Sequence, residues 1–133
     1  MRRSYSPGVC AALAIAALRL SLSPAYAHHS AAMFDVGHDT VIQGTIKDFQ
    51  WTNPHSWLLV QESGGSGRLW SFESGPPNIL ARIGVKRNQF PTGEKITVHA
   101  FLMKDGSPAG LVTRVVKADG TEITLGSIGS EKH

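Results

Sequence analysis

Two adjacent histidines, His28 and His29, are the residues best placed for chemistry, provided that cleavage after Ala27 makes His28 the N-terminus. A terminal histidine offers its α-amine and its imidazole to one metal ion, and planar sets of nitrogen ligands suit copper(II). With histidine in second place, the α-amine, the intervening amide and the imidazole form a similar chelate. The pair is therefore a candidate copper site. The alternative is two histidines that simply follow a permissive cleavage site on an extended arm.

His55 is the candidate for a third metal ligand. The bend predicted at Asn53-Pro54 holds it at the mouth of a β-favouring segment, where binding residues tend to lie. Its alternative role is that of a hydrogen-bonding histidine at the start of a strand. His99, on the polar side of a later alternating segment, is expected to be solvated.

Other metal sites have little support in the sequence. His38 and His133 have no supporting context, and Cys10 is the single cysteine. Neither a cysteine-containing zinc pattern nor a His-Glu-x-x-His helix is present, so we expect no structural or protease-type zinc.

Tryptophan side chains provide a second candidate site, an aromatic face that stacks on sugars or bases. Trp51, in a turn beside Asn53, is expected to be exposed, and these two residues are the candidate ligand contacts. Trp57 and Trp70 are expected to fill the core, because a small domain with few large side chains needs their volume.

Support for catalysis is thin. There is no Gly-x-Ser-x-Gly elbow, and Glu73 and Asp48 are expected to be solvated charges rather than an acid–base pair. We therefore expect a protein that is not an enzyme. The enzymatic alternative is a copper-dependent oxidoreductase built on the terminal histidine.

The first 27 residues have the pattern of a cleaved secretory signal. An arginine pair precedes the apolar run 9–18, and Ser23-Pro24 leads to the small-residue site Ala25-Tyr26-Ala27. The run is too short to cross a bilayer as a helix, so we expect export to the periplasm or beyond, with no membrane span. The arginine pair and Arg19 leave the twin-arginine route open beside the general one.

The charge balance argues against a nucleic-acid partner. The formal net charge is +3, but Arg2, Arg3 and Arg19 all belong to the expected leader. Thirteen basic residues less these three leaves ten, and ten acidic residues oppose them. The processed chain would be close to neutral, without the basic surface that a polyanion requires.

Period-two alternation and turn residues predict a mainly β domain over residues 40–125, between an extended arm at 28–39 and a flexible tail at 126–133. Strands are expected at 40–49, 55–62, 68–74, 96–102, 111–117 and 121–125, with a short helix at 78–83 that ends at Gly84. This order predicts a small five- to six-stranded Greek-key barrel like the oligonucleotide/oligosaccharide-binding (OB) fold, with the helix between strands three and four. A β meander or a small sandwich would give the same pattern.

Several segments together resemble the small exported bacterial proteins grouped as the domain of unknown function 6152 family. They are Ala27-His28-His29-Ser30 with Phe34-Asp35, Gly44-Thr45-Ile46, Phe49 to His55, Trp70 to Glu73, Leu80 to Gly84 and Asp105-Gly106-Ser107. The resemblance spans most of the chain after the leader. It implies export and a shared fold, and it places His28, His29, Asn53, Pro54 and His55 at recurring motif positions, but it carries no activity.

These observations together predict an exported binding protein that takes a metal ion, copper above all, or a small ligand of the cell envelope. The alternative is a metal-free module that holds an oligosaccharide or an envelope partner on its aromatic face.

Overall fold

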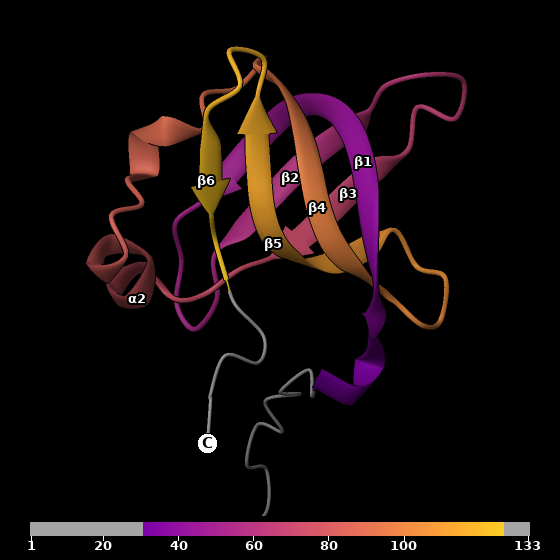
Figure 1. Ribbon diagram of the computed structural model, residues 1–133, viewed down its shortest axis with the longest axis horizontal. Helices are drawn as coiled ribbons and strands as arrows, with labels where there is room; N and C mark the ends of the chain where they lie inside the picture. Colours follow the sequence, from indigo (N-terminus) through magenta and orange to yellow (C-terminus); the bar gives the residue numbers. More distant parts are fainter. Residues whose placement is uncertain (1–30, 127–133) are drawn as a thin grey trace, which may run out of the picture.

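The computed structural model describes residues 31–126, and most of them lie in strands (Figure 1). The strands are β1 (Phe34–Gln50), β2 (Trp57–Glu62), β3 (Leu69–Glu73), β4 (Lys95–Met103), β5 (Ala109–Lys117) and β6 (Glu122–Thr124). The helices are η2 (Ala31–Met33), α2 (Pro77–Arg82) and η3 (Arg87–Gln89). The mainly β class and the short helix between β3 and β4 are confirmed. The expected leader at 1–27 and residues 127–133 of the expected tail lie outside the described residues.

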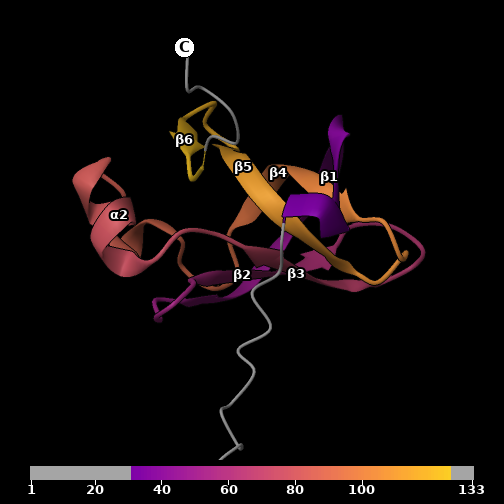
Figure 2. The same ribbon diagram turned by 90° about the horizontal axis from the view of Figure 1, so that it is seen from below.

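One sheet contains all six described strands, in the order β3-β2-β1-β4-β5-β6. Neighbours in this order are antiparallel, and β3 also pairs in parallel with β5, from Ser71 opposite Ala109 to Glu73 opposite Leu111. Seen from below, β2 and β3 lie on one side of the molecule and β4 and β5 on the other (Figure 2). The apolar side chains are enclosed between these two sides.

The long strand β1 joins the two sides. It pairs with β4 at Phe34 and from Asp39 to Thr45, and with β2 from Gly44 to Gln50, so Gly44 and Thr45 have partners on both edges. The strand begins at Phe34, so the expected arm is wrong for residues 34–39. The register against β4 shifts between Phe34 and Asp39, and this irregularity hides the two-residue period in the sequence.

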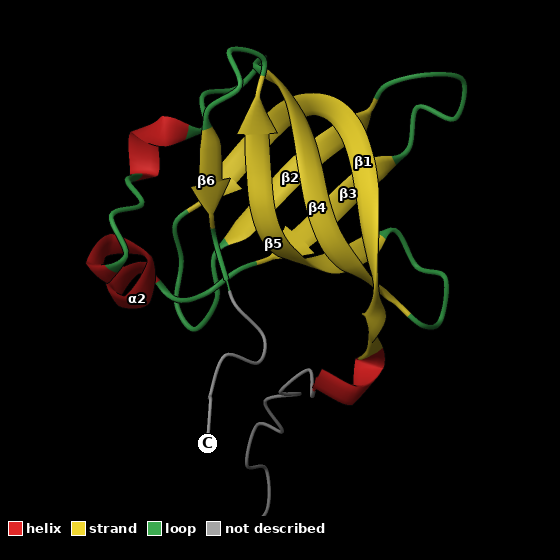
Figure 3. Ribbon diagram, in the orientation of Figure 1, coloured by secondary structure: helices red, strands yellow, loops and turns green. Residues whose placement is uncertain are grey.

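The inward-facing residues of the strands make one apolar core, whose burial is the main source of stability in a domain without cysteine pairs. Its fully or nearly fully buried members from the strands include Ile46, Leu58, Val60, Phe72, Val98, Ala100, Val112 and Val115. Leu80 is the buried residue of α2, which lies beside the sheet (Figure 3). The helix is followed by Gly84 at φ +88°, the left-handed terminator that the sequence predicts.

The helices of residues 31–126 are short, and none of them has the length and apolar character needed to cross a membrane.

We predict that Gly44→Ala lowers the free energy of unfolding by about 1–3 kcal/mol, because the added methyl group overpacks the sheet. A Cβ at this position would meet the carbonyl oxygen of Gln61 and the side chain of Val60. Urea unfolding followed by circular dichroism measures the change. The control is Gly65→Ala, where a Cβ meets nothing within 4 Å, so equal stability losses in the two variants would contradict the argument.

Candidate functional site

Of the three predicted metal ligands, His55 lies within the described residues, whereas His28 and His29 precede them. His55 belongs to the connection between β1 and β2, residues 51–56, which we call the β1–β2 connection. This connection contains a cis Asn53-Pro54 bond, and the Thr52 hydroxyl donates a hydrogen bond to the carbonyl oxygen of His55 at 2.8 Å. The predicted bend is therefore present, and it is held by a local hydrogen bond.

The segment after β3 holds the β1–β2 connection in place. The N–H of Ser56 donates to the carbonyl oxygen of Gly75 at 3.1 Å, and the N–H of Ser74 donates to the carbonyl oxygen of Ser56 at 2.9 Å. These two bonds extend the β2–β3 pairing beyond the ends of both strands. They fix the backbone beside His55 relative to Glu73, the last residue of β3.

Glu73 is the direct partner of His55. Its Oε1 atom contacts Nδ1 of His55, and the side chains of His55 and Glu73 are 37% and 6% exposed. The expectation that Glu73 is a solvated charge is wrong, because its cross-strand neighbours Trp57 on β2 and Leu111 on β5 flank it on both sides. A buried carboxylate thus holds one ring nitrogen of His55, and Nε2 is the nitrogen left for a ligand.

This arrangement resembles the environment of histidines that bind metals. Such histidines generally use one ring nitrogen for the metal, while a carboxylate or carbonyl group holds the other and fixes the orientation of the ring. His55 with Glu73 has the second half of that arrangement. A structural ion pair, the alternative role of His55, has the same geometry.

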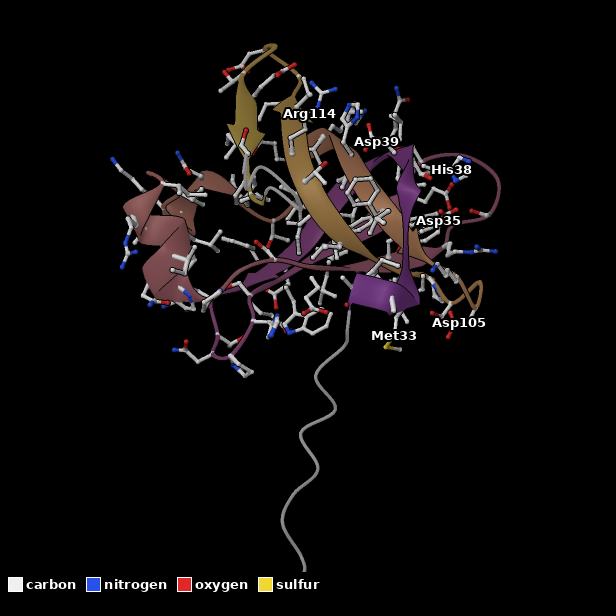
Figure 4. The ribbon with its side chains drawn as sticks, turned by 60° about the horizontal axis from the view of Figure 1, so that its bottom comes forward. Met33, Asp35, His38, Asp39, Asp105 and Arg114 are labelled. Carbon is white, nitrogen blue, oxygen red and sulfur yellow. The ribbon has the colours of Figure 1, made fainter. Side chains whose placement is uncertain are left out.

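Two further histidines use Nδ1 in the same way. Nδ1 of His38 lies 2.9 Å from Oδ2 of Asp35, and Nδ1 of His99 lies 2.8 Å from Oδ2 of Asp39. The hydrogen bond from His38 is the main cause that holds the pKa of Asp35 below its ordinary value. Figure 4 shows Asp35 and His38 together at the exposed start of β1, where their side chains are 48% and 81% exposed. This pair has a solvated carboxylate, unlike that of His55.

His99 belongs to a row of polar side chains that crosses β1, β4, β5 and β6. Besides Asp39, it contacts Arg114, whose Nη2 is 3.4 Å from Nδ1 of His99, and Nη1 of Arg114 lies 3.1 Å from Oε1 of Glu122. Figure 4 shows Asp39 and Arg114 on this face. The side chain of His99 is 14% exposed, so the expectation of a solvated residue is wrong. Its polar neighbours cover it, and the row reads most simply as a structural network.

No group of three or more metal-ligating side chains comes together within residues 31–126. A metal at His55 would therefore need ligands from the rest of the chain or from another molecule. In Figure 1, η2, where the described chain begins, and the β1–β2 connection both lie in the lower half of the view, on opposite sides.

The tryptophans divide between packing and partial exposure. Trp70 is 5% exposed and stacks on Phe72 at 5.9 Å between ring centroids, which confirms its place in the core. Its indole N–H donates to Glu62 at 3.0 Å and is the main cause that lowers the pKa of Glu62. Trp51 is half-buried with its ring edge-on to Phe49 at 5.8 Å, so it is less exposed than expected.

Trp57 is half-buried on β2 and Asn53 is exposed in the β1–β2 connection. The expectation that Trp57 fills the core is therefore only partly met. The two predicted ligand contacts, Trp51 and Asn53, are thus partly and fully exposed, and Trp57 is a further ring left partly in solvent.

The family model of a family of unknown function, DUF6152, matches the chain over residues 16–114. The chain belongs to this family. The matched range includes His28, His29 and His55, together with Glu73 and Arg114. Comparisons with curated proteins and with solved structures gave no match.

Sequence reasoning missed the role of Glu73. Because successive residues of a strand face opposite sides, Glu73 lies on the same side of β3 as Ser71, away from the core. A carboxylate on that side is ordinarily solvated. Its burial arises from pairing with strands that are distant in sequence. One signal in the sequence could have identified it. Glu73 lies near the end of the strand predicted at 68–74, and the neighbouring strand, predicted at 55–62, starts at His55.

We predict that His55→Ala lowers the free energy of unfolding by about 1–3 kcal/mol at pH 7, because it leaves the buried Glu73 carboxylate without its partner. Urea denaturation measures the loss. His38→Ala is the matched control, since it breaks the same kind of pair at an exposed position and should change stability little. A loss no larger for His55→Ala than for His38→Ala would show that the His55 pair contributes nothing to folding.

Proposed function

We propose that this chain is an exported protein, periplasmic or secreted, that binds copper(II) through His28, His29 and His55 after removal of residues 1–27. The protein is a binding protein rather than an enzyme. The observation that carries the proposal is the pairing of Nδ1 of His55 with the buried carboxylate of Glu73, which leaves Nε2 available on a ring that is 37% exposed. A carboxylate that binds the other ring nitrogen orients a metal-binding imidazole and raises its basicity.

The terminal histidines supply the remaining nitrogens. Cleavage after Ala27 would give an α-amine, a backbone amide and two imidazoles within two residues, all of them ligands that copper(II) favours. From the Cα atom of Ala31, an extended chain carries that of His29 about 7 Å and that of His28 about 11 Å. Figure 1 places η2 and the β1–β2 connection on opposite sides, so this short reach counts against His55 joining the terminal histidines on one ion, and a variant of His55 tests its participation directly.

The proposed site is sensitive to protons as well as to geometry. An α-amine has an unperturbed pKa of about 7.7–8.0 and a histidine one of about 6.5, and both must lose their proton to bind a metal. Copper affinity therefore falls as the pH drops from 8 to 6.

We also infer that the sheet closes into a small barrel of the OB type. The support is the additional pairing of β3 with β5, which returns the order β3-β2-β1-β4-β5 to its start, with α2 inserted between β3 and β4. In such barrels the face of strands two and three and the connection between strands one and two are common binding surfaces. His55, Asn53 and Trp51 belong to that connection.

We predict that the processed protein binds copper(II) at least tenfold more tightly than its His55→Ala variant, a difference of about 1.4 kcal/mol. Mass spectrometry first establishes whether the mature chain begins at His28, and competitive titration with copper(II) then gives the affinities. The control is His38→Ala, which removes a histidine from an exposed pair.

Each element of the proposal has its own negative result. Equal copper affinities for the wild type and His55→Ala remove His55 from the site, and a mature terminus other than His28 removes the terminal chelate. Because His55→Ala can also weaken folding, Glu73→Gln provides a second variant. It keeps a hydrogen-bonding side chain, and the expected loss of affinity is about tenfold, as for other partners of metal-binding histidines.

A second candidate function is the binding of an oligosaccharide or an envelope partner without metal. The observation that favours it is the partial exposure of Trp51 and Trp57 together with the full exposure of Asn53, which lies between them in the sequence. Aromatic rings next to an amide group suit a sugar, because the ring stacks on its apolar face and the amide bonds its hydroxyl groups.

We predict that soluble cell-envelope glycans quench the fluorescence of Trp51 if this second function is correct. The measurement compares the wild type with Trp51→Phe and with Trp70→Phe, whose ring is packed in the core. Quenching that disappears in Trp51→Phe alone supports the function. Unchanged fluorescence in the wild type rejects it.

A further inference from the structure

A groove lies between β6 and the segment that follows α2. Its volume is ≈ 460 Å³, with residues of the helix end and of η3 on one wall and residues of β6 on the other. The first wall includes Ile83, Val85 and Gln89, and the second includes Glu122, Ile123 and Thr124. None of these residues belongs to the proposed copper site.

The β6 wall of the groove is an open strand edge. Within residues 31–126, β6 pairs with β5 alone. The carbonyl oxygen of Thr121 accepts from Lys117 at 2.9 Å, and the N–H of Leu125 donates to Thr113 at 2.9 Å. Because backbone groups alternate in an antiparallel ladder, those of Glu122 and Thr124 point away from β5. Two residues that line the groove thus offer N–H and C=O groups to an added strand.

The opposite wall contains one exposed large aliphatic residue. Ile83 is 52% exposed, although Val85, two residues later, is 3% exposed. Ile123 on β6 is partly buried and packs against the core. Ile83 beside an open strand edge offers an apolar contact to a strand that adds there.

The segment 77–93 surrounding this wall is positively charged. It contains Arg82, Lys86 and Arg87 and no acidic residue. Each of the three is exposed, and none forms an ion pair with a carboxylate of residues 31–126. Glu122, the one acidic residue lining the groove, is already paired with Arg114. On the β6 side, Asp119 is exposed two residues before Thr121 and forms no ion pair within residues 31–126. Three uncompensated basic residues thus stand against one uncompensated acidic residue, and the balance near the groove is positive.

We propose that this groove binds an extended acidic segment of a partner protein, which adds as a strand to the free edge of β6. Backbone groups of the segment pair with Glu122 and Thr124, alternate apolar side chains pack against Ile83, and acidic side chains lie near Arg82, Lys86 and Arg87. Strand addition to a sheet edge, with side-chain pockets for specificity, is a common way to bind a peptide.

An anionic membrane surface is the other occupant that basic and exposed aliphatic residues could attract. Ile79 is 40% exposed and lies four residues before Ile83, so the two share one side of this segment. The open strand edge and the groove itself favour the peptide, because a flat lipid surface uses neither. Vesicle binding is accordingly a test outcome that counts against the proposal.

The experiment begins with a random seven-residue peptide library displayed on phage and selected on the immobilised full chain. One enriched peptide is then synthesised with and without N-methyl groups on alternate backbone amides, and its affinity is measured by fluorescence anisotropy. We expect enriched peptides with net negative charge and alternating apolar residues, and at least tenfold weaker binding after N-methylation of the amides facing β6.

Two pairs of matched variants place the peptide. Ile83→Asp should weaken binding about tenfold, whereas Ile79→Asp, at an exposed isoleucine outside the groove, should not. Lys86→Glu with Arg87→Glu should weaken it about tenfold at low salt, whereas Lys47→Glu with Lys95→Glu, at exposed lysines elsewhere, should not. All six substituted residues are exposed, so folding should be preserved.

Several outcomes overturn the proposal. They are failure of the library to yield a binding sequence, equal binding of the N-methylated peptide, equal effects of the matched variants, and sedimentation of the chain with phosphatidylglycerol vesicles that Ile83→Asp abolishes. The last result would assign the surface to lipid.

Discussion

The two-sided pairing of β1 is the constraint on which the sheet depends. Its first half belongs with β4 and its second half with β2, and the two ladders overlap at Gly44 and Thr45. A side chain at Gly44 would meet the backbone of β2, so the overlap needs a residue without Cβ. Because β2 carries β3 and β4 carries β5, this overlap also brings β3 and β5 within pairing distance. The position of Glu73 between β2 and β5 follows from it.

Burial of the carboxylate partner distinguishes His55 from the other histidines of residues 31–126. All of them contact a carboxylate through Nδ1, but Asp35 and Asp39 are about half exposed, whereas the side chain of Glu73 is 6% exposed. A carboxylate in water loses little when its partner turns away, whereas a buried one loses the interaction that offsets its desolvation. The ring of His55 is therefore held more firmly than the ring of His38. Firm orientation of a partly exposed imidazole is what a binding site requires, whichever ligand it takes.

The fold was more predictable from the sequence than the site, for a physical reason. Alternation of apolar residues along one strand is a local property, and so are a glycine after a helix and a proline after Asn53. These local patterns therefore predict the elements nearly in place. The bulged start of β1 was missed because its register shift breaks the alternation. Burial of Glu73 and of His99 depends on which strands become neighbours, and no local pattern contains that information. Local pattern alone therefore predicts both residues in solvent.

The segment after β3 links the candidate site to the groove. It begins beside His55, where Gly75 and Ser74 bond with Ser56, and it continues through α2, whose Leu80 is fully buried, to Ile83 and Val85. Leu80 itself accepts a hydrogen bond from the N–H of Val85 at 2.9 Å, so the end of the helix and the groove wall move with the core. A partner in the groove and a ligand at His55 would therefore contact opposite ends of one well-packed segment. Because close-packed interiors have low compressibility and transmit strain, this segment is the physical route by which a shift at one site would reach the other.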